Sequence, residues 1–173
     1  MQRPELQFEC VALNGMPVTI RPIRPEDREI ERSFVESLSD HSRFLRFFSA
    51  MKKLSPKLLD HLINVDFPRE MAFIATINVN GVEQEIGVAR YAPSETDGSA
   101  EFAIVVADEW HGQGIGRELL RHLFDVARSA GIRRIEGSVL ATNSNMVRFC
   151  HGLGFTSRLD VHDPGLLRVA MDL

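Results

Sequence analysis

The amino-acid sequence predicts an α/β protein of the α+β type, with a mixed, mostly antiparallel sheet of about six to seven strands flanked by helices. Two observations carry this prediction. Asn-Gly pairs at 14–15 and 80–81 each separate two segments rich in β-forming residues, which is typical of tight β-hairpins. Later in the chain, β-branched segments alternate with amphipathic helical segments, which is typical of strands joined through a helix. A sheet with both kinds of connection contains antiparallel and parallel strand pairs.

The first half of the chain is predicted to form two hairpins with three helices between them. Pro25 suits the first turn of a helix, and Ser39 suits the residue that caps the next one. Ser55 followed by proline is a strong signal for the start of a third helix. The expected elements are strands at 6–13 and 16–21, helices at 25–38, 40–48 and 56–64, and strands at 72–78 and 85–92.

The second half is predicted to alternate strands and helices. A β-branched apolar segment follows the polar loop PSETDG, and a helix then carries apolar residues at helical spacing along one stripe. Gly131 is well placed to end that helix. The expected elements are a strand at 99–107, a helix at 114–130, a strand at 132–140, a helix at 143–153, and strands at 155–161 and 167–173.

Length and composition indicate one globular domain over residues 1–173. The apolar content of 44% and the charged content of 25% are ordinary for a globular protein. A net charge of −4 gives no reason to expect a nucleic-acid partner, and the longest apolar run, 102–107, is too short to cross a membrane. The N-terminal residues lack the pattern of a signal peptide, and Cys10 and Cys150 show no metal-type spacing. We therefore expect a cytoplasmic protein without a metal cofactor.

The most informative segment is 101–120, in which a β-branched strand meets a glycine-rich turn that opens an amphipathic helix. Its glycines are Gly112, Gly114 and Gly116. The first turn of a helix leaves backbone N–H groups without partners at the positive end of the helix dipole, and glycines let a ligand approach that backbone. A phosphate or pyrophosphate is therefore the expected ligand. The alternative is a glycine-rich connection that binds nothing.

Two common phosphate-binding motifs do not fit this turn. A P-loop needs a Lys-Ser or Lys-Thr pair after its glycines, and none follows here. The dinucleotide-binding pattern GxGxxG also fails, because Arg117 and Leu119 stand where glycine is needed. The turn therefore predicts neither a P-loop nor a Rossmann fold.

The segment HGQGIG at 111–116 resembles the coenzyme A motif Q/R-x-x-G-x-G/A of the GNAT superfamily of N-acetyltransferases, with histidine at the usual Gln or Arg position. A second family signature, N-x-x-A-x-x-x-Y-x-x-x-G-F, resembles 143–155, with Met146 at the small residue and Cys150 at the usual Tyr. These departures resemble one subgroup, the acetyltransferase domain of bacterial protein-lysine acetyltransferases. Further resemblance to that subgroup lies in the stretches TIRPIRPEDREIERSFVESLSDHSRFLRFF, IGVARY, AEFAIVV and NSNMVRFCHGLGF. The order of elements resembles the GNAT fold over nearly the whole chain, which implies a splayed pair of central strands.

This resemblance implies a site for acetyl-CoA. In the family pattern the strand before the turn pairs its backbone with the pantetheine arm, one of its N–H groups points at the thioester oxygen, and the turn holds the pyrophosphate. A buried core position is the alternative for that strand, and both readings are compatible. His111 is expected to touch the phosphates or to face water, and Asn143 to contact the coenzyme, to cap a helix, or both. The residues implied in coenzyme binding are Ile104, Val105, Val106, His111, Gly112, Gln113, Gly114, Ile115, Gly116, Arg117 and Asn143.

Glu101 is the candidate general base. A lysine amine has an ordinary pKa of about 10.4, so it arrives charged and must lose a proton, directly or through a water, before it attacks. Glu101 is the only acid in 99–107 and falls where the resembled subgroup carries its base. Its apolar neighbours are expected to raise the pKa of its carboxyl, whereas a solvated carboxylate at a strand end is the alternative. No general acid is evident: Cys150 is expected to pack in the core, and the coenzyme A thiolate can leave unassisted.

The family resemblance thus implies an enzyme that transfers the acetyl group of acetyl-CoA directly to a primary amine, and the resemblance to the subgroup makes a protein lysine the first choice of acceptor. The acceptor side is expected to include Phe44, Arg46, Phe47 and Phe48, although such a run is more often an apolar helix face with its arginines reaching to solvent. The alternatives are a small-molecule amine acetyltransferase and a coenzyme-A-binding regulatory module with little catalysis. Apart from acetyl-CoA and the acceptor amine, no nucleic-acid or membrane partner is expected, and the chain is expected to be a monomer or homodimer.

Overall fold

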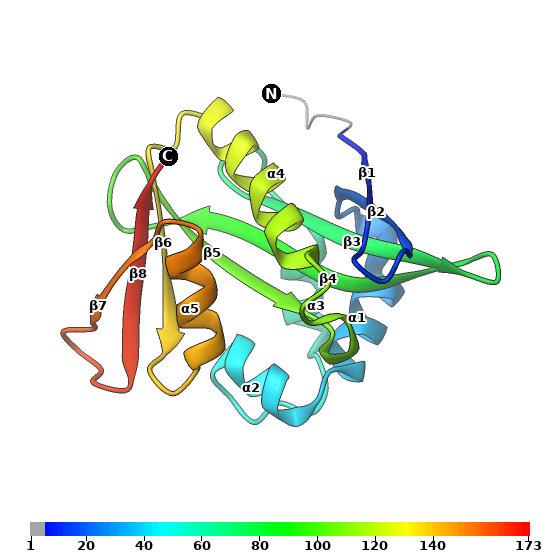
Figure 1. The fold of residues 1–173 in the computed structure, drawn as a ribbon, viewed down its shortest axis with the longest axis horizontal. Helices are drawn as coiled ribbons and strands as arrows, with labels where there is room; N and C mark the ends of the chain where they lie inside the picture. Colours follow the sequence, from blue (N-terminus) through cyan, green and yellow to red (C-terminus); the bar gives the residue numbers. More distant parts are fainter. Residues whose placement is uncertain (1–5) are drawn as a thin grey trace.

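The computed structural model describes residues 6–173, which form one eight-stranded sheet with helices on both faces (Figure 1). Residues 1–5 lie outside the described residues. They belong to the predicted domain and to the N-terminal segment in which no signal-peptide pattern was found. The strands are β1 (Phe8–Val11), β2 (Pro17–Pro22), β3 (Met71–Val79), β4 (Val82–Pro93), β5 (Ser99–Val106), β6 (Arg134–Leu140), β7 (Thr156–Leu159) and β8 (Leu166–Asp172). The helices are α1 (Arg28–Ser37), α2 (Asp40–Phe47), α3 (Pro56–Ile63), α4 (Ile115–Ser129) and α5 (Ser144–Gly152), with 3-10 turns η1 (Pro25–Asp27) and η2 (Asp108–Trp110).

The sheet is mixed and mostly antiparallel, as the sequence predicted. Its strand order is β1-β2-β3-β4-β5-β6-β8-β7, and only the β5–β6 pair is parallel among the described strands. The sheet has eight strands, slightly more than the six to seven expected for it, and its short edge strands β1 and β7, of 4 residues each, lie within segments that were predicted as strands. α4 connects the two parallel strands, since a parallel pair needs a crossover connection.

The helices divide between the two faces of the sheet (Figure 1). α4 packs its apolar stripe, which includes Leu119 and Leu123, on one face, and α5 contributes Cys150 to the same apolar cluster. On the other face α1 and α3 cover β3 and β4, where Phe34 and Leu59 belong to a second cluster. Burial of these two clusters is the main favourable contribution to folding.

The parallel strands β5 and β6 pair only at their first residues and then separate. Their register runs from Ser99 opposite Arg134 to Glu101 opposite Glu136. Beyond that point β5 stays paired with β4 and β6 with β8, so an opening forms between them. We call this opening the fork. The predicted splayed pair of central strands is confirmed, and one backbone edge of β5 is left without a strand partner among the described residues.

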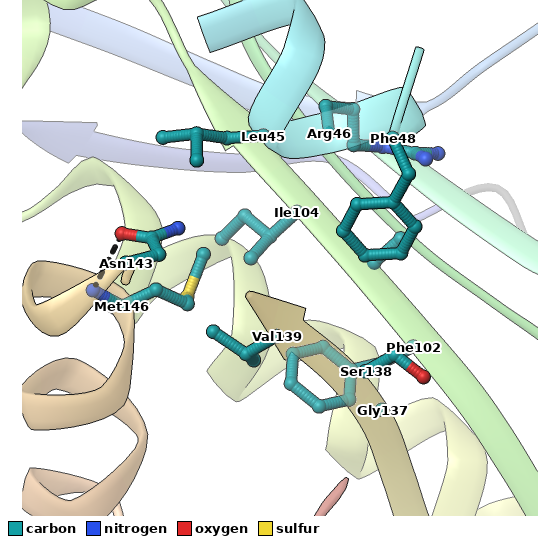
Figure 2. Close-up of a pocket in the computed structure, with 11 residues that line it drawn as sticks. Leu45, Arg46, Phe48, Phe102, Ile104, Gly137, Ser138, Val139, Asn143 and Met146 are labelled. Atoms are coloured by element: carbon teal, nitrogen blue, oxygen red, sulfur yellow. Dashed lines mark hydrogen bonds between the residues drawn. The ribbon is translucent and has the colours of Figure 1, made fainter. Parts of the chain in front are cut away.

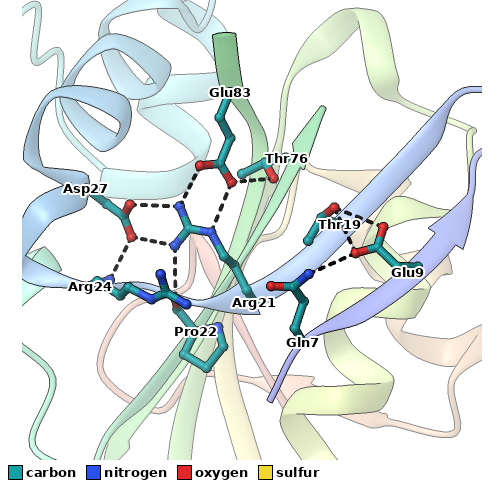
Figure 3. Close-up of polar contacts among 9 residues, drawn as sticks. All are labelled: Gln7, Glu9, Thr19, Arg21, Pro22, Arg24, Asp27, Thr76 and Glu83. Atoms are coloured by element: carbon teal, nitrogen blue, oxygen red, sulfur yellow. Dashed lines mark hydrogen bonds and ion pairs between the residues drawn. The ribbon is translucent and has the colours of Figure 1, made fainter. Parts of the chain in front are cut away.

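A buried arginine ties the start of α1 to the sheet. The Arg21 guanidinium, in a residue 5% exposed, donates two hydrogen bonds to Asp27 at 2.8 Å and two to Glu83 at 3.0 Å (Figure 3). Asp27 also accepts a hydrogen bond from the backbone N–H of Arg24 at 2.7 Å. Because these contacts hold the chain in a tight turn, the helix predicted from Pro25 begins as η1 and continues as α1.

Candidate active site

The fork opens into a cleft of about 830 Å³. Its walls come from β5, the glycine-rich turn with the first turn of α4, α2, and the start of α5. Of the described residues predicted for the site, Gln113 and Glu101 lie outside this lining. The predicted coenzyme-binding residues that line the cleft are Ile104, Val105, Val106, His111, Gly112, Gly114, Ile115, Gly116, Arg117 and Asn143.

The glycine-rich turn presents helix N–H groups to the cleft. Gly112 and Gly114 have φ angles of +72° and +85°, a backbone conformation that residues with side chains rarely adopt. Gly114 caps α4, and no side chain of the described residues hydrogen-bonds there, so the N–H groups of Ile115, Gly116 and Arg117 lack intrahelical partners. A Cβ at Gly112 or Gly114 would meet no atom within 4 Å. The space beside the turn is therefore open to a ligand, and this helix end favours an anion.

Gly116 allows α4 to pack closely against its neighbours. A Cβ at this position would lie 3.3 Å from Phe149 Cζ and 3.5 Å from Ile104 Cδ1. Glycine therefore allows the first turn of α4 to approach α5 and β5 closely. The third glycine of the motif is explained by this close approach.

Gln113 joins the glycine-rich turn to the first hairpin. Its side-chain Oε1 accepts a hydrogen bond from the Asn14 N–H at 2.9 Å, and its carbonyl oxygen accepts one from the Leu13 N–H at 3.2 Å. Leu13 itself lines the cleft. The Gln113 side chain therefore positions the turn, and the role in coenzyme binding predicted for this residue stays a prediction.

His111 contacts the end of β5. Its ring Nε2 lies 2.8 Å from the carbonyl oxygen of Val106, to which it donates a hydrogen bond when that nitrogen carries the proton. The residue is exposed and lines the cleft. The structure thus adds a third role to the two that the sequence left open, namely holding the Val106 carbonyl.

Asn143 and Ile104 each combine a structural role with a place in the wall of the cleft. The Asn143 side-chain Oδ1 accepts a hydrogen bond from the Met146 N–H at 3.2 Å and so caps α5, while the residue also lines the cleft (Figure 2). Ile104 is 7% exposed and belongs to the apolar cluster beneath α4, yet it borders the cleft as well. Asn143 therefore caps α5 and Ile104 packs in the core, while both residues also form part of the wall of the cleft.

Asp108, which the sequence analysis did not identify, fixes α2 against the cleft. Its carboxylate accepts hydrogen bonds from the Ser39 N–H at 3.2 Å and from the Ser42 hydroxyl. Although burial raises the pKa of Asp108, the hydrogen bonds from Ser42 and Ser39 lower it overall. The partners lie 69 and 66 residues away in the sequence, so no local pattern predicts this contact.

Glu101 lies where β5 and β6 begin to separate. Its side chain is 48% exposed, and its Oε1 is 3.4 Å from Arg168 Nη1 on β8. Glu136 stands opposite on β6, with its Oε1 at 3.7 Å from Arg168 Nη2. The apolar environment predicted for Glu101 is wrong, because the side chain is half-exposed and faces a guanidinium. The sequence also missed Arg168 and Glu136, which reach Glu101 only through strand pairing.

Cys150 is a core residue, as the sequence predicted. It is 0% exposed, and burial raises the pKa of its thiol to about 11. It lies outside the lining of the cleft. The Cys150 thiol is therefore not placed to donate a proton to a molecule in the cleft.

Two phenylalanines of the aromatic run at the end of α2 are exposed. Phe44 and Phe48 are each 43% exposed, so the alternative of a buried apolar helix face holds only in part. Arg46 lines the cleft, and its guanidinium lies 4.7 Å from the centre of the Phe47 ring. Burial and the neighbouring Arg90 guanidinium lower the pKa of Arg46 to about 10, so it remains positively charged at neutral pH.

Neither a metal-type cluster nor a membrane-spanning helix is found within residues 6–173. No three His, Cys, Asp or Glu side chains in this range come together as metal ligands. No helix in the same range is both long and apolar enough to cross a membrane. Cys10 and Cys150 are both free cysteines.

Comparison with known proteins identifies relatives over most of the chain. The model of the acetyltransferase (GNAT) family matches residues 30–155. Acetyltransferase PA5475 of Pseudomonas aeruginosa is 41% identical over 150 residues, which cover 87% of this chain and 81% of that protein. Acetyltransferase Pat of Mycolicibacterium smegmatis is 30% identical over 137 residues, which cover 78% of this chain but only 40% of that protein. The crystal structure of the GNAT domain of S. lividans PAT has a TM-score of 0.86 at 31% identity, and the match covers 96% of this chain and 97% of that one.

The family match and the structural match agree with the geometry of the fork. The matched range includes the glycine-rich turn, both fork strands and α5. The family uses acetyl-CoA as its acetyl donor and an amine as acceptor. The chain belongs to the acetyltransferase (GNAT) family and is a GNAT-type N-acetyltransferase similar to the GNAT domain of PAT.

Proposed function

We propose that this enzyme uses acetyl-CoA to acetylate lysine side chains of proteins, with Glu101 as the general base. The observation that carries the proposal is the continuous cleft, which runs from the start of α4 along β5 to the fork, with Glu101 at the fork's closed end. A donor held along this path and an amine arriving at the fork would meet beside β5.

The cleft offers a separate group for each part of the coenzyme. The N–H groups of Ile115, Gly116 and Arg117 suit the pyrophosphate, because they are unpaired at the positive end of α4. The open edge of β5 offers backbone donors and acceptors to the amides of the pantetheine arm. An N–H group of the segment 104–106 would then donate to the thioester oxygen and stabilise the negative charge that develops on it.

We infer that the acceptor arrives on the face of the sheet to which Glu101 points. Side chains alternate along a strand, and Ala100 and Phe102 point into the apolar cluster beneath α4 and α5. Glu101 therefore points to the opposite face, where it is half-exposed. It takes a proton from the lysine ammonium, directly or through a water.

The chemistry that follows needs no further catalytic residue. The neutral amine nitrogen attacks the thioester carbonyl carbon, and the carbon–sulfur bond breaks. The coenzyme A thiolate leaves with the electron pair and takes up the second proton from the new amide nitrogen. The exposed Glu101 carboxyl returns its proton to solvent.

Two observations favour a protein lysine over a small amine. The sequence resembles the protein-lysine acetyltransferase subgroup, and the GNAT domain of S. lividans PAT matches nearly the whole chain. The exposed Phe44 of α2 and Phe48, which follows the end of α2, offer contact surface to a folded protein. The proposal places the reaction in the cytoplasm, where the free thiols of Cys10 and Cys150 would stay reduced.

The test follows radiolabelled acetyl-CoA incubated with the pure enzyme and a cell extract, whose proteins and small molecules are separated afterwards. We expect enzyme-dependent label in the protein fraction and its loss with Glu101→Gln. The matched control is Glu95→Gln, because Glu95 is an exposed acid in the loop before β5 and lines no part of the cleft. Label confined to small molecules would contradict the lysine acceptor, and full activity of Glu101→Gln would contradict its role as base.

A further inference from the structure

A second cavity, of about 50 Å³, continues the cleft into the closed end of the fork (Figure 2). The two share the lining residues Leu45, Arg46, Ile104, Asn143 and Met146. The cleft follows β5 from the glycine-rich turn to this point. The small cavity therefore lies at the end of the cleft where the thioester of a bound coenzyme would arrive.

Phe102 closes the far end of this cavity. A Cβ on Gly137 would lie 2.9 Å from Phe102 Cε1, so the ring fits against β6 only because residue 137 has no side chain. The ring also packs on Phe155 and Phe124, with centroid distances of 5.1 Å and 6.1 Å. Because Phe102 is held on these sides, the cavity does not deepen in this direction without disturbing the core.

Met146 narrows the cavity from the side. Figure 2 shows its side chain extending from α5 toward Ile104 and Val139, into the space between the two strands. The family signature has a small residue at this position. Relative to alanine, methionine adds its Cγ, Sδ and Cε atoms to this space. A smaller residue at position 146 would therefore enlarge the cavity, whereas Phe102 is held in place by its neighbours.

We infer that this cavity receives the acyl group of the donor and that Met146 limits the chain to about the length of acetyl. A single water needs about 10–15 Å³ of cavity, so about 50 Å³ accepts roughly three to five groups of that size. The three non-hydrogen atoms of an acetyl group fit within this range, whereas the five of a butyryl group would need its upper limit. The inference rests on the proposed function only in requiring a coenzyme A thioester in the cleft, and it does not depend on which amine is the acceptor.

The experiment measures the dissociation constants of acetyl-CoA, propionyl-CoA and butyryl-CoA by calorimetry. Wild type is expected to bind butyryl-CoA at least about tenfold more weakly than acetyl-CoA, because excess methylenes in a full apolar pocket change discrimination by about 10–200-fold. Met146→Ala is expected to reduce this ratio below about threefold. Val147→Ala is the matched control: it also shortens an apolar side chain of α5 but borders neither cavity, and it should keep the wild-type ratio.

A second variant keeps the test decisive if Met146→Ala folds poorly. Val139→Ala enlarges the same cavity from β6 and should lower the ratio in the same direction. An unchanged ratio in both variants would overturn the inference, as would equal affinity of wild type for acetyl-CoA and butyryl-CoA. If that ratio is unchanged and a kinetic assay of Met146→Ala shows a change in the KM of the acceptor amine alone, the cavity belongs to the amine and the inference is overturned. Failure of the proposed function has a different signature: no thioester binds, or acetyl-CoA binds and no lysine is acetylated.

Discussion

The substitution Gly114→Ala tests whether the glycine-rich turn binds the pyrophosphate of the coenzyme. Gly114 has a φ of +85°, and a Cβ there would meet no protein atom within 4 Å. Alanine is therefore opposed by backbone strain, which costs about 1–2 kcal/mol for a left-handed residue, and by no clash within the protein. With a coenzyme bound, the same Cβ would project into the space that the ligand needs.

Gly81 provides a matched control for the strain. It has a φ of +83°, and a Cβ added there would likewise meet no atom within 4 Å, but it lies in the turn between β3 and β4, outside the cleft lining. Both variants should lower the free energy of unfolding by about 1–2 kcal/mol, which corresponds to a decrease of about 2–8 °C in Tm. Only Gly114→Ala should weaken coenzyme A binding, by about tenfold or more, which equals about 1.4 kcal/mol.

The assay combines urea unfolding with calorimetric titration of two ligands, coenzyme A and pantetheine. Pantetheine lacks the pyrophosphate, so its affinity should be equal in wild type and in both variants. The reasoning is refuted if Gly114→Ala binds coenzyme A as tightly as Gly81→Ala does. Equal loss of affinity for both ligands would also contradict it, because the turn would then contact some other part of the coenzyme.

Three further predictions concern the buried network, its pH dependence and the core cysteine. Arg21→Met should lower the free energy of unfolding by about 3–5 kcal/mol, because it leaves the buried Asp27 carboxylate without its partner. The control is Arg32→Met, which removes an exposed ion pair and should leave the urea midpoint nearly unchanged. Arg21 lowers the pKa of the Glu83 carboxyl and, against the effect of burial, the pKa of the Asp27 carboxyl. The free energy of unfolding of the wild type should therefore fall as the pH drops below about 4. Urea unfolding at a series of pH values should show a smaller decrease in Arg21→Met. Cys150→Ala should keep most of kcat in a thiol-release assay, and a loss beyond about a hundredfold would contradict its packing role.

Local elements were predictable because their signals and their structures involve the same few residues. Asn80 and Gly81 have φ angles of +53° and +83°, as a type I′ hairpin turn requires, and this turn was predicted from the Asn-Gly pair alone. Ser39 and Ser55 accept hydrogen bonds from the backbone N–H groups of residues 42 and 58, as predicted for helix caps. The glycine-rich turn of the candidate site belongs to the same class.

The remaining parts of the site depend on segments that are distant in the sequence. Gln113 meets Asn14, and Glu101 meets Arg168, through contacts between residues 99 and 67 positions apart. The environment of Glu101 was mispredicted for a related reason. Its neighbours in the sequence are apolar, but alternate residues of a strand point to opposite faces, so they do not surround its carboxylate.

Mass spectrometry tests most directly whether the enzyme transfers acetyl groups to protein lysines with Glu101 as the base. Extract proteins are incubated with acetyl-CoA and either wild type, Glu101→Gln, Glu95→Gln or no enzyme, and the acetylated atoms are identified. We expect acetyl groups on lysine side-chain nitrogens with wild type and Glu95→Gln, and only the enzyme-free background with Glu101→Gln. Equal lysine acetylation by Glu101→Gln, or acetyl groups on small amines alone, would contradict it.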